Sequence, residues 1–156
     1  MSSSPPLTIV SGGQTGADRA ALDYAIHSGL PHDGWCPRGR RAEDGPLPPR
    51  YALQETPSPG YAERTEWNVR DSDATVVFAL QTELTGGTRL TAQLAERMQR
   101  PLLVLAADAA GPLEAAVLLR QFLSQHKPAR LNVAGPRASQ QPEIAAYVDA
   151  VLAAAL

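Results

Sequence analysis

A glycine-rich turn near the start of the chain has the composition of an anion-binding loop. The apolar run LTIV (7–10) leads into SGGQTGAD (11–18), and a helical pattern begins almost at once. Glycines in such a turn leave backbone N–H groups uncovered, and the first turn of a helix adds unpaired N–H groups with a partial positive charge. A plain tight turn would use the same glycines, so this motif alone leaves both interpretations open. The candidate contacts are Gly12, Gly13, Gln14, Thr15, Gly16 and Asp18.

Asp18 complicates this interpretation. A carboxylate in the first helical turn can cap the helix or orient an arginine, but it would repel a phosphate placed too near. The motif also differs from the better-known phosphate loops, because the chain contains neither the Gly-Lys-Ser/Thr of a P-loop nor a GxGxxG fingerprint.

A second turn of the same kind follows the apolar run ATVVFAL (74–80). It places Gly86, Gly87 and Thr88 at the start of another helical pattern. In a doubly wound sheet of order 2-1-3-4-5, strands 1 and 3 are neighbours, and their connections leave to opposite faces, which opens a crevice at the carboxyl ends of the strands. Two glycine-rich helix starts beside one crevice predict a small anionic or nucleotide-like ligand.

Arginines in the middle of the chain are candidate partners for such a ligand. Four of them lie within 13 residues, with Glu43 and Asp44 among them: Arg38, Arg40, Arg41 and Arg50. They would either clamp a phosphate or carboxylate with their planar guanidinium groups or form a solvated loop with local ion pairs. The helical pattern of 64–73 places Arg64 and Asn68 on one face, and both are included among the candidate contacts.

Composition and spacing argue against several other function classes. The net charge is −2 and the sequence pI is about 5.9, whereas a nucleic-acid-binding domain usually carries a basic surplus. The histidines and Cys36 lack zinc-site spacing, so we expect no protein metal site. The sequence lacks the GxSxG elbow that would indicate a serine nucleophile, and we assign no catalytic residue. Cys36 fits either a small buried hydrophobe or a reactive thiol.

The chain lacks the patterns of membrane insertion and export. It has no run of about 18 apolar residues, and MSSSPPL has neither the basic start nor the apolar segment of a signal peptide. A single cysteine also fits a reducing compartment. We therefore expect a cytoplasmic protein without membrane contact.

Alternating strand and helix patterns predict one α/β domain over residues 1–156. Short apolar runs without alternation predict strands that are buried on both faces of a parallel sheet, at 7–10, 33–37, 74–80, 101–107 and 130–135. Helices are predicted at 16–29, 64–72, 88–99, 112–126 and 141–155. The expected architecture has three layers, with five parallel strands in the order 2-1-3-4-5 and helices on both faces of the sheet.

The segment 37–63 interrupts this rhythm with six prolines and no clear period. A loop of that length inside a compact domain is functional or disordered, and Tyr51, Leu53 and Tyr61 could anchor it. This segment and the alanine-rich last helix offer more apolar surface than a monomer needs to cover its sheet. We therefore expect a homo-oligomer.

Together these motifs resemble those of the molybdenum carrier family, part of the wider SLOG superfamily that includes the lonely-guy phosphoribohydrolases. The resemblance covers roughly residues 7–156 and rests on SGGQTGADRAALDYA, GWCPRGRRAEDG, YALQETPSPGYAERTEWNVRDSDATVVF, TGGTRLT and LNVAGPR. It implies a Rossmann-like fold, a homodimer or homotetramer, and binding of molybdenum cofactor, a pterin with a dithiolene and a terminal phosphate. The implied role is storage, protection or delivery without chemistry on the cofactor, with molybdenum enzymes or cofactor-synthesis proteins as partners.

The resemblance also implies roles for individual residues. The loops SGGQTGAD and TGGT would hold the anionic parts of the ligand, and Arg38, Arg40 and Arg41 would lie near it. The metal would be held by the cofactor's own sulfurs.

Two other functions remain open. Lonely-guy proteins cleave the N-glycosidic bond of nucleoside monophosphates with a motif PGGxGTxxE, and aligning Gly87 and Thr88 with it puts Thr91 where the glutamate would be. A threonine cannot act as a base or stabilise an oxocarbenium charge as a carboxylate can, so the alignment disfavours a hydrolase. The other is a nucleotide sensor, which SLOG domains also resemble; a fused effector domain would support it, and we expect none here.

Overall fold

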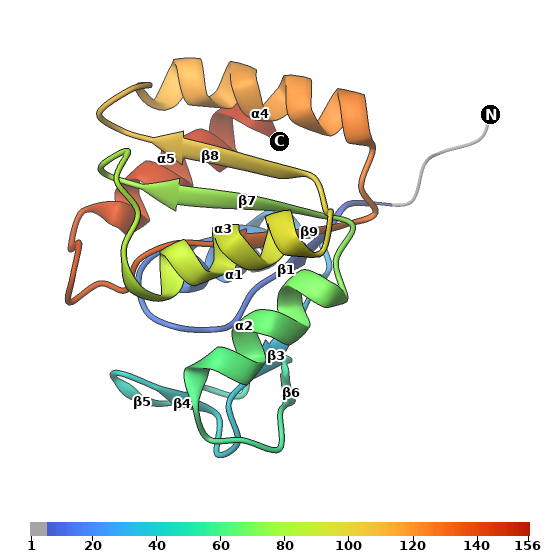
Figure 1. Ribbon diagram of the computed structural model, residues 1–156, viewed down its shortest axis with the longest axis vertical. Coiled ribbons are helices and arrows are strands. Elements are labelled where there is room, and N and C mark those ends of the chain that lie inside the picture. Colours follow the sequence, from blue (N-terminus) through green and yellow to red (C-terminus); the bar gives the residue numbers. More distant parts are fainter. Residues whose placement is uncertain (1–5) are drawn as a thin grey trace.

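The computed structural model describes residues 6–156, and its centre is a parallel β-sheet (Figure 1). The five strands are β1 (Thr8–Val10), β2 (His32–Asp33), β7 (Ala74–Ala79), β8 (Leu102–Ala106) and β9 (Arg130–Ala134). All six residues of β7 are buried, because helices cover both faces of the sheet. This burial explains why the apolar runs show no alternation, and it confirms the predicted α/β class.

The predicted strand order is wrong. The sheet runs β2-β1-β9-β7-β8, so the last strand of the chain lies between the first strand and β7. When the strands are counted from β9 and continued through β1, β2, β7 and β8, the same sheet reads 3-2-1-4-5, which is the Rossmann order. The chain therefore begins at what is ordinarily the second strand, and the topological switch point lies between β9 and β7.

The helices form two layers, one on each face of the sheet (Figure 1). Helices α1 (Ala17–Ser28), α4 (Pro112–His126) and α5 (Ile144–Ala155) pack together on one face, while α2 (Tyr61–Arg70) and α3 (Gly86–Arg97) pack together on the other. All five helices were predicted, with bounds within three residues of those observed. One difference matters for function: α3 begins at Gly86, so both glycines of the second turn belong to the helix itself.

The last helix is buried within the monomer. Helix α5 packs against both α1 and α4, and Ile144, Val148, Val151 and Leu152 are fully buried in the main core. Its apolar stripe therefore faces this chain's own helices. The argument for an oligomer from the last helix is not supported, and the oligomer itself stays a prediction.

The proline-rich segment is ordered around its own small core. Short strands β3 (Trp35–Cys36) and β6 (Gln54–Glu55) pair in parallel, and β4 (Arg41–Ala42) and β5 (Gly45–Pro46) form a hairpin. The predicted strand 33–37 is split at Gly34, whose φ is 140° and where a Cβ would lie 2.1 Å from the carbonyl oxygen of Ser11. The apolar side chains under this segment are Leu22, Cys36, Leu47, Tyr51 and Leu53. Cys36 is thus a buried core residue.

Candidate functional site

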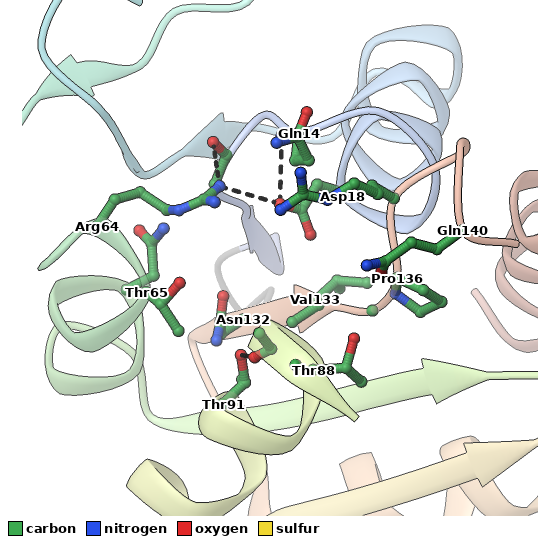
Figure 2. A pocket seen from close by; sticks show the side chains of 17 residues that line it. Gln14, Asp18, Arg64, Thr65, Thr88, Thr91, Asn132, Val133, Pro136 and Gln140 are labelled. Carbon is green, nitrogen blue, oxygen red and sulfur yellow. Dashed lines mark hydrogen bonds and ion pairs between the residues drawn. The ribbon is translucent and has the colours of Figure 1, made fainter. Parts of the chain in front are cut away.

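A polar cavity of about 180 Å³ opens at the carboxyl ends of the central strands (Figure 2). Three strand-to-helix loops contribute to its lining: the loop after β1, the start of α3 after β7, and residues 132–140 at and after the end of β9. Helix α2 adds Arg64, Thr65 and Asn68. Residues of both glycine-rich loops therefore line one cavity, and β9, which lies between β1 and β7, supplies its third wall.

The first glycine loop satisfies its own backbone donors. The N–H of Gly13 donates to the hydroxyl of Ser11 (3.3 Å), that of Gln14 to the Asp18 carboxylate (3.3 Å), and that of Thr15 to the Gln14 side-chain oxygen (3.0 Å). Asp18 therefore accepts one of these hydrogen bonds, and all three N–H groups already have acceptors within the chain.

Two glycines of this loop are required by close packing. A Cβ on Gly12 would lie 2.3 Å from the Arg64 guanidinium. Gly16 has a φ of 82°, and a Cβ there would lie 2.4 Å from the carbonyl oxygen of Pro136. The sequence left open whether these glycines serve a tight turn or a bound anion. Close packing in the turn accounts for both of them.

The second glycine loop is different, because packing does not require its glycine at 87. A Cβ on Gly87 would meet no heavy atom within 4 Å, and the N-cap residue Thr85 makes no side-chain capping hydrogen bond. Gly86, Gly87 and Thr88 line the cavity. The start of α3 therefore offers uncapped N–H groups and the positive end of a helix dipole beside open space.

A buried ion pair lies on the opposite side of the cavity. Arg64 donates to the Asp18 carboxylate at 3.3 Å and to the carbonyl oxygen of Gly12 at 2.8 Å, and both side chains are about nine-tenths buried. Figure 2 shows the two side chains reaching toward each other above Asn132, Thr88 and Thr91. Burial raises the pKa of the Asp18 carboxyl to about 6, against the lowering effect of the positive charge on Arg64.

A second arginine that the sequence analysis did not select also lines the cavity. Arg137 follows β9, and its guanidinium lies over the ring of Tyr61 at 5.2 Å, where Arg64 also stacks at 5.3 Å. Among the described residues, the Arg137 guanidinium makes no recorded ion pair. The signal for it was the motif LNVAGPR, a third glycine-containing turn at the end of a strand.

Gln14 has a donor without a partner. Its side-chain oxygen accepts hydrogen bonds from the N–H groups of Thr15 (3.0 Å) and Glu43 (2.8 Å), which fixes the orientation of the amide. Its side-chain nitrogen is buried and, in the part of the chain that the structure describes, has no hydrogen-bond partner. Since buried polar groups are nearly always satisfied, this nitrogen indicates an acceptor supplied by a ligand or by water.

The remaining predicted site residues have other contacts. The guanidinium of Arg40 donates to the carbonyl oxygens of Leu47, Pro48, Tyr51 and Leu53 and so holds the proline-rich segment together. Arg41 donates to the carbonyl oxygen of Pro59, and Arg38 is exposed. None of these three arginines lines the cavity. Asn68 does, but its amide is committed to both backbone groups of Trp35.

The cavity suits anion binding better than glycosidic hydrolysis. Thr91 lines it, one helical turn after Gly87, and its hydroxyl donates to the Gly87 carbonyl oxygen at 2.9 Å. The one carboxylate in its described lining is Asp18, which is held by Arg64. Cationic side chains, amide groups and a helix start together favour a bound phosphate or similar oxyanion.

The Asp18 carboxyl is expected to titrate with a midpoint near pH 6. Its pKa is raised from 3.8 to about 6 in the folded chain, so folding takes up a proton between these values. The stability that this group contributes is present below about pH 4 and is lost as the pH rises through 6, by about 3 kcal/mol in total. Carbon NMR of the Asp18 carboxyl gives the midpoint, and Asp18→Asn should remove this component of the pH dependence of unfolding. A midpoint below about 4 would contradict the desolvated environment.

Comparison with known proteins agrees with this fold. A family model described as the Circularly permutated YpsA SLOG family matches residues 9–156. A crystal structure of a Syntrophus aciditrophicus SB protein, named there "Putative molybdenum carrier protein", is 44% identical and superposes with a TM-score of 0.95, covering 97% of this chain and 96% of that chain. No curated protein gave a match. The resemblance found in the sequence is therefore confirmed, and the permuted strand order agrees with the family's description.

The part of the chain that the structure describes contains neither a candidate membrane-spanning helix nor a candidate metal-binding cluster. None of the helices there is long and apolar enough to cross a membrane. Over the same residues, 6–156, no group of three or more His, Cys, Asp and Glu side chains is placed to hold a metal ion.

Proposed function

The chain belongs to the Circularly permutated YpsA SLOG family, and we propose that it binds molybdenum cofactor for storage or delivery, with the cofactor's terminal phosphate at the start of α3. The observation that carries the proposal is the open helix start at Gly87, which shares one cavity with the buried Arg64 and with the Gln14 amide nitrogen that has no partner among the described residues. The name of the related Syntrophus protein supports the choice of ligand.

Residues from different walls of the cavity would make different contacts with the ligand. The N–H groups of Gly87 and Thr88 would donate hydrogen bonds to the phosphate oxygens, because these groups are unpaired and the helix start is positive. Arg64 and Arg137 would neutralise the phosphate charge from the other side. The Gln14 amide nitrogen would donate the hydrogen bond that it lacks in the described chain.

Binding without turnover follows from the same residues. Among the described residues that line the cavity, Asp18 is the one with a carboxylate. This carboxylate pairs with Arg64 and accepts a hydrogen bond from the Gln14 N–H, so it already has partners within the protein. The dithiolene sulfurs of the cofactor would keep the molybdenum, so the protein would hold its cargo through the phosphate and the pterin. We further propose that a molybdenum enzyme or a cofactor-synthesis protein receives the cargo.

The proposal is tested by identifying what the protein carries. The chain is produced in a host that makes molybdenum cofactor and in a matched host that does not, and both samples are measured by native mass spectrometry and then by denaturing release. We expect an added mass only from the first host and a released pterin that becomes fluorescent on oxidation. Release of a nucleotide from both samples, or failure of the apo-protein to bind the cofactor on mixing, would contradict the proposal.

A further inference from the structure

A second hollow of about 280 Å³ adjoins the cavity. Three residues line both spaces: Thr88 at the start of α3, and Pro136 and Gln140 in the loop after β9. A ligand held at the helix start can therefore extend from one space into the other. Pockets for small ligands usually measure about 300–1,000 Å³, which neither space reaches alone.

The hollow has a mixed lining. Ala79, Leu84 and Pro136 contribute apolar surface to it, beside the polar side chains of Glu83, Gln140 and Gln141. An apolar wall with a polar edge suits a flat heterocycle, whose faces need apolar contact and whose rim carries hydrogen-bonding groups.

One polar side chain of the hollow is already held in place. The side-chain oxygen of Gln141 accepts the N–H of Leu80 at 3.0 Å, which fixes the orientation of the amide. Its nitrogen is thereby left as a donor that a ring acceptor, such as a carbonyl oxygen, would use. The neighbouring Gln140 makes no recorded side-chain hydrogen bond to residues 6–156.

Glu83 gives the hollow its one described carboxylate. Among the described residues it forms no recorded ion pair, so both of its oxygens remain available as acceptors. Two carboxylate oxygens match a ring edge that presents two neighbouring N–H donors. The aminopyrimidinone edge of pterin and guanine has that pattern, whereas adenine lacks the ring N–H.

We propose that this hollow holds the heterocyclic half of the phosphorylated ligand, and that Glu83 selects an aminopyrimidinone edge. The inference rests on the proposed function, because it takes the phosphate to lie at the start of α3. It assigns recognition of the ring to Glu83, Leu84 and Gln141, and recognition of the charge to the cavity.

The test compares three probes by calorimetry: inorganic phosphate, guanosine monophosphate and adenosine monophosphate. We expect the wild-type protein to bind the guanine nucleotide about tenfold more tightly than the adenine nucleotide, the equivalent of one or two good hydrogen bonds. Glu83→Gln should reduce this preference to about twofold and change phosphate affinity by no more than about twofold. Glu96→Gln, the same change at an exposed position of α3 outside the hollow, should behave as wild type.

The outcomes separate this inference from the proposed function. Equal binding of the two nucleotides by the wild-type protein, or an unchanged preference in Glu83→Gln, would overturn the assignment of Glu83 while phosphate binding stands. An equal loss of phosphate and nucleotide affinity in Glu83→Gln would also overturn it, because the effect would then not be on ring recognition. Absence of phosphate binding by the wild-type protein would overturn the proposed function and this inference together.

Discussion

Valine at position 87 is expected to weaken phosphate binding strongly while the fold persists. Apart from the chain neighbours and the backbone of α3 itself, no described atom lies within 4 Å of a Cβ at Gly87, so the protein has room for the side chain. The branched side chain would instead stand where the phosphate must approach the N–H groups of residues 87 and 88. Losing these charge-assisted hydrogen bonds should weaken binding by about a hundredfold, or about 3 kcal/mol. Calorimetry with inorganic phosphate measures the effect.

The matched control is Gly111→Val at the start of α4. Gly111 is also an open glycine at a helix N-terminus, and it lies outside the cavity. We expect this variant to keep wild-type phosphate affinity, and both variants to keep the wild-type circular dichroism spectrum. Unchanged affinity in Gly87→Val would remove the start of α3 from the site.

Replacing Arg64 with methionine should have the largest effect on stability. The change leaves the Asp18 carboxyl buried without its partner and removes the hydrogen bond to the Gly12 carbonyl oxygen. Breaking a buried ion pair from one side costs about 3–5 kcal/mol. Urea denaturation should show this loss, and the pKa of Asp18 should rise further because its compensating positive charge is gone.

Two comparisons show whether this loss comes from the pair. Adding Asp18→Asn to the Arg64→Met variant should recover part of the stability, because the unpaired carboxylate is then absent. Arg70→Met, on the same helix, breaks an exposed pair with Asp71 and should cost no more than about 1 kcal/mol. No recovery in the double variant, or equal losses in Arg64→Met and Arg70→Met, would contradict a buried pair.

Local patterns were enough to predict the five helices, the main strands of the central sheet and the two glycine loops. Strand and helix bounds depend on the spacing of apolar residues, on glycines such as Gly29 and on prolines such as Pro112, all of which are read within a few residues. The two strand-to-helix turns are also local motifs, and their similarity was enough to predict a ligand site at the carboxyl ends of the strands. The family resemblance also rested on such contiguous motifs.

Only the tertiary structure decided which of these residues form the site. The place of β9 between β1 and β7 is a pairing between the two ends of the chain, which no local pattern encodes, and it brought Arg137 into the cavity. The structure likewise distinguishes two arginines that were both candidate ligand contacts. Backbone carbonyl oxygens hold Arg40, whereas Arg64 is buried against Asp18. The sequence determined the elements because periodicity is local, and the fold determined the chemistry because burial and pairing depend on residues far apart in the chain.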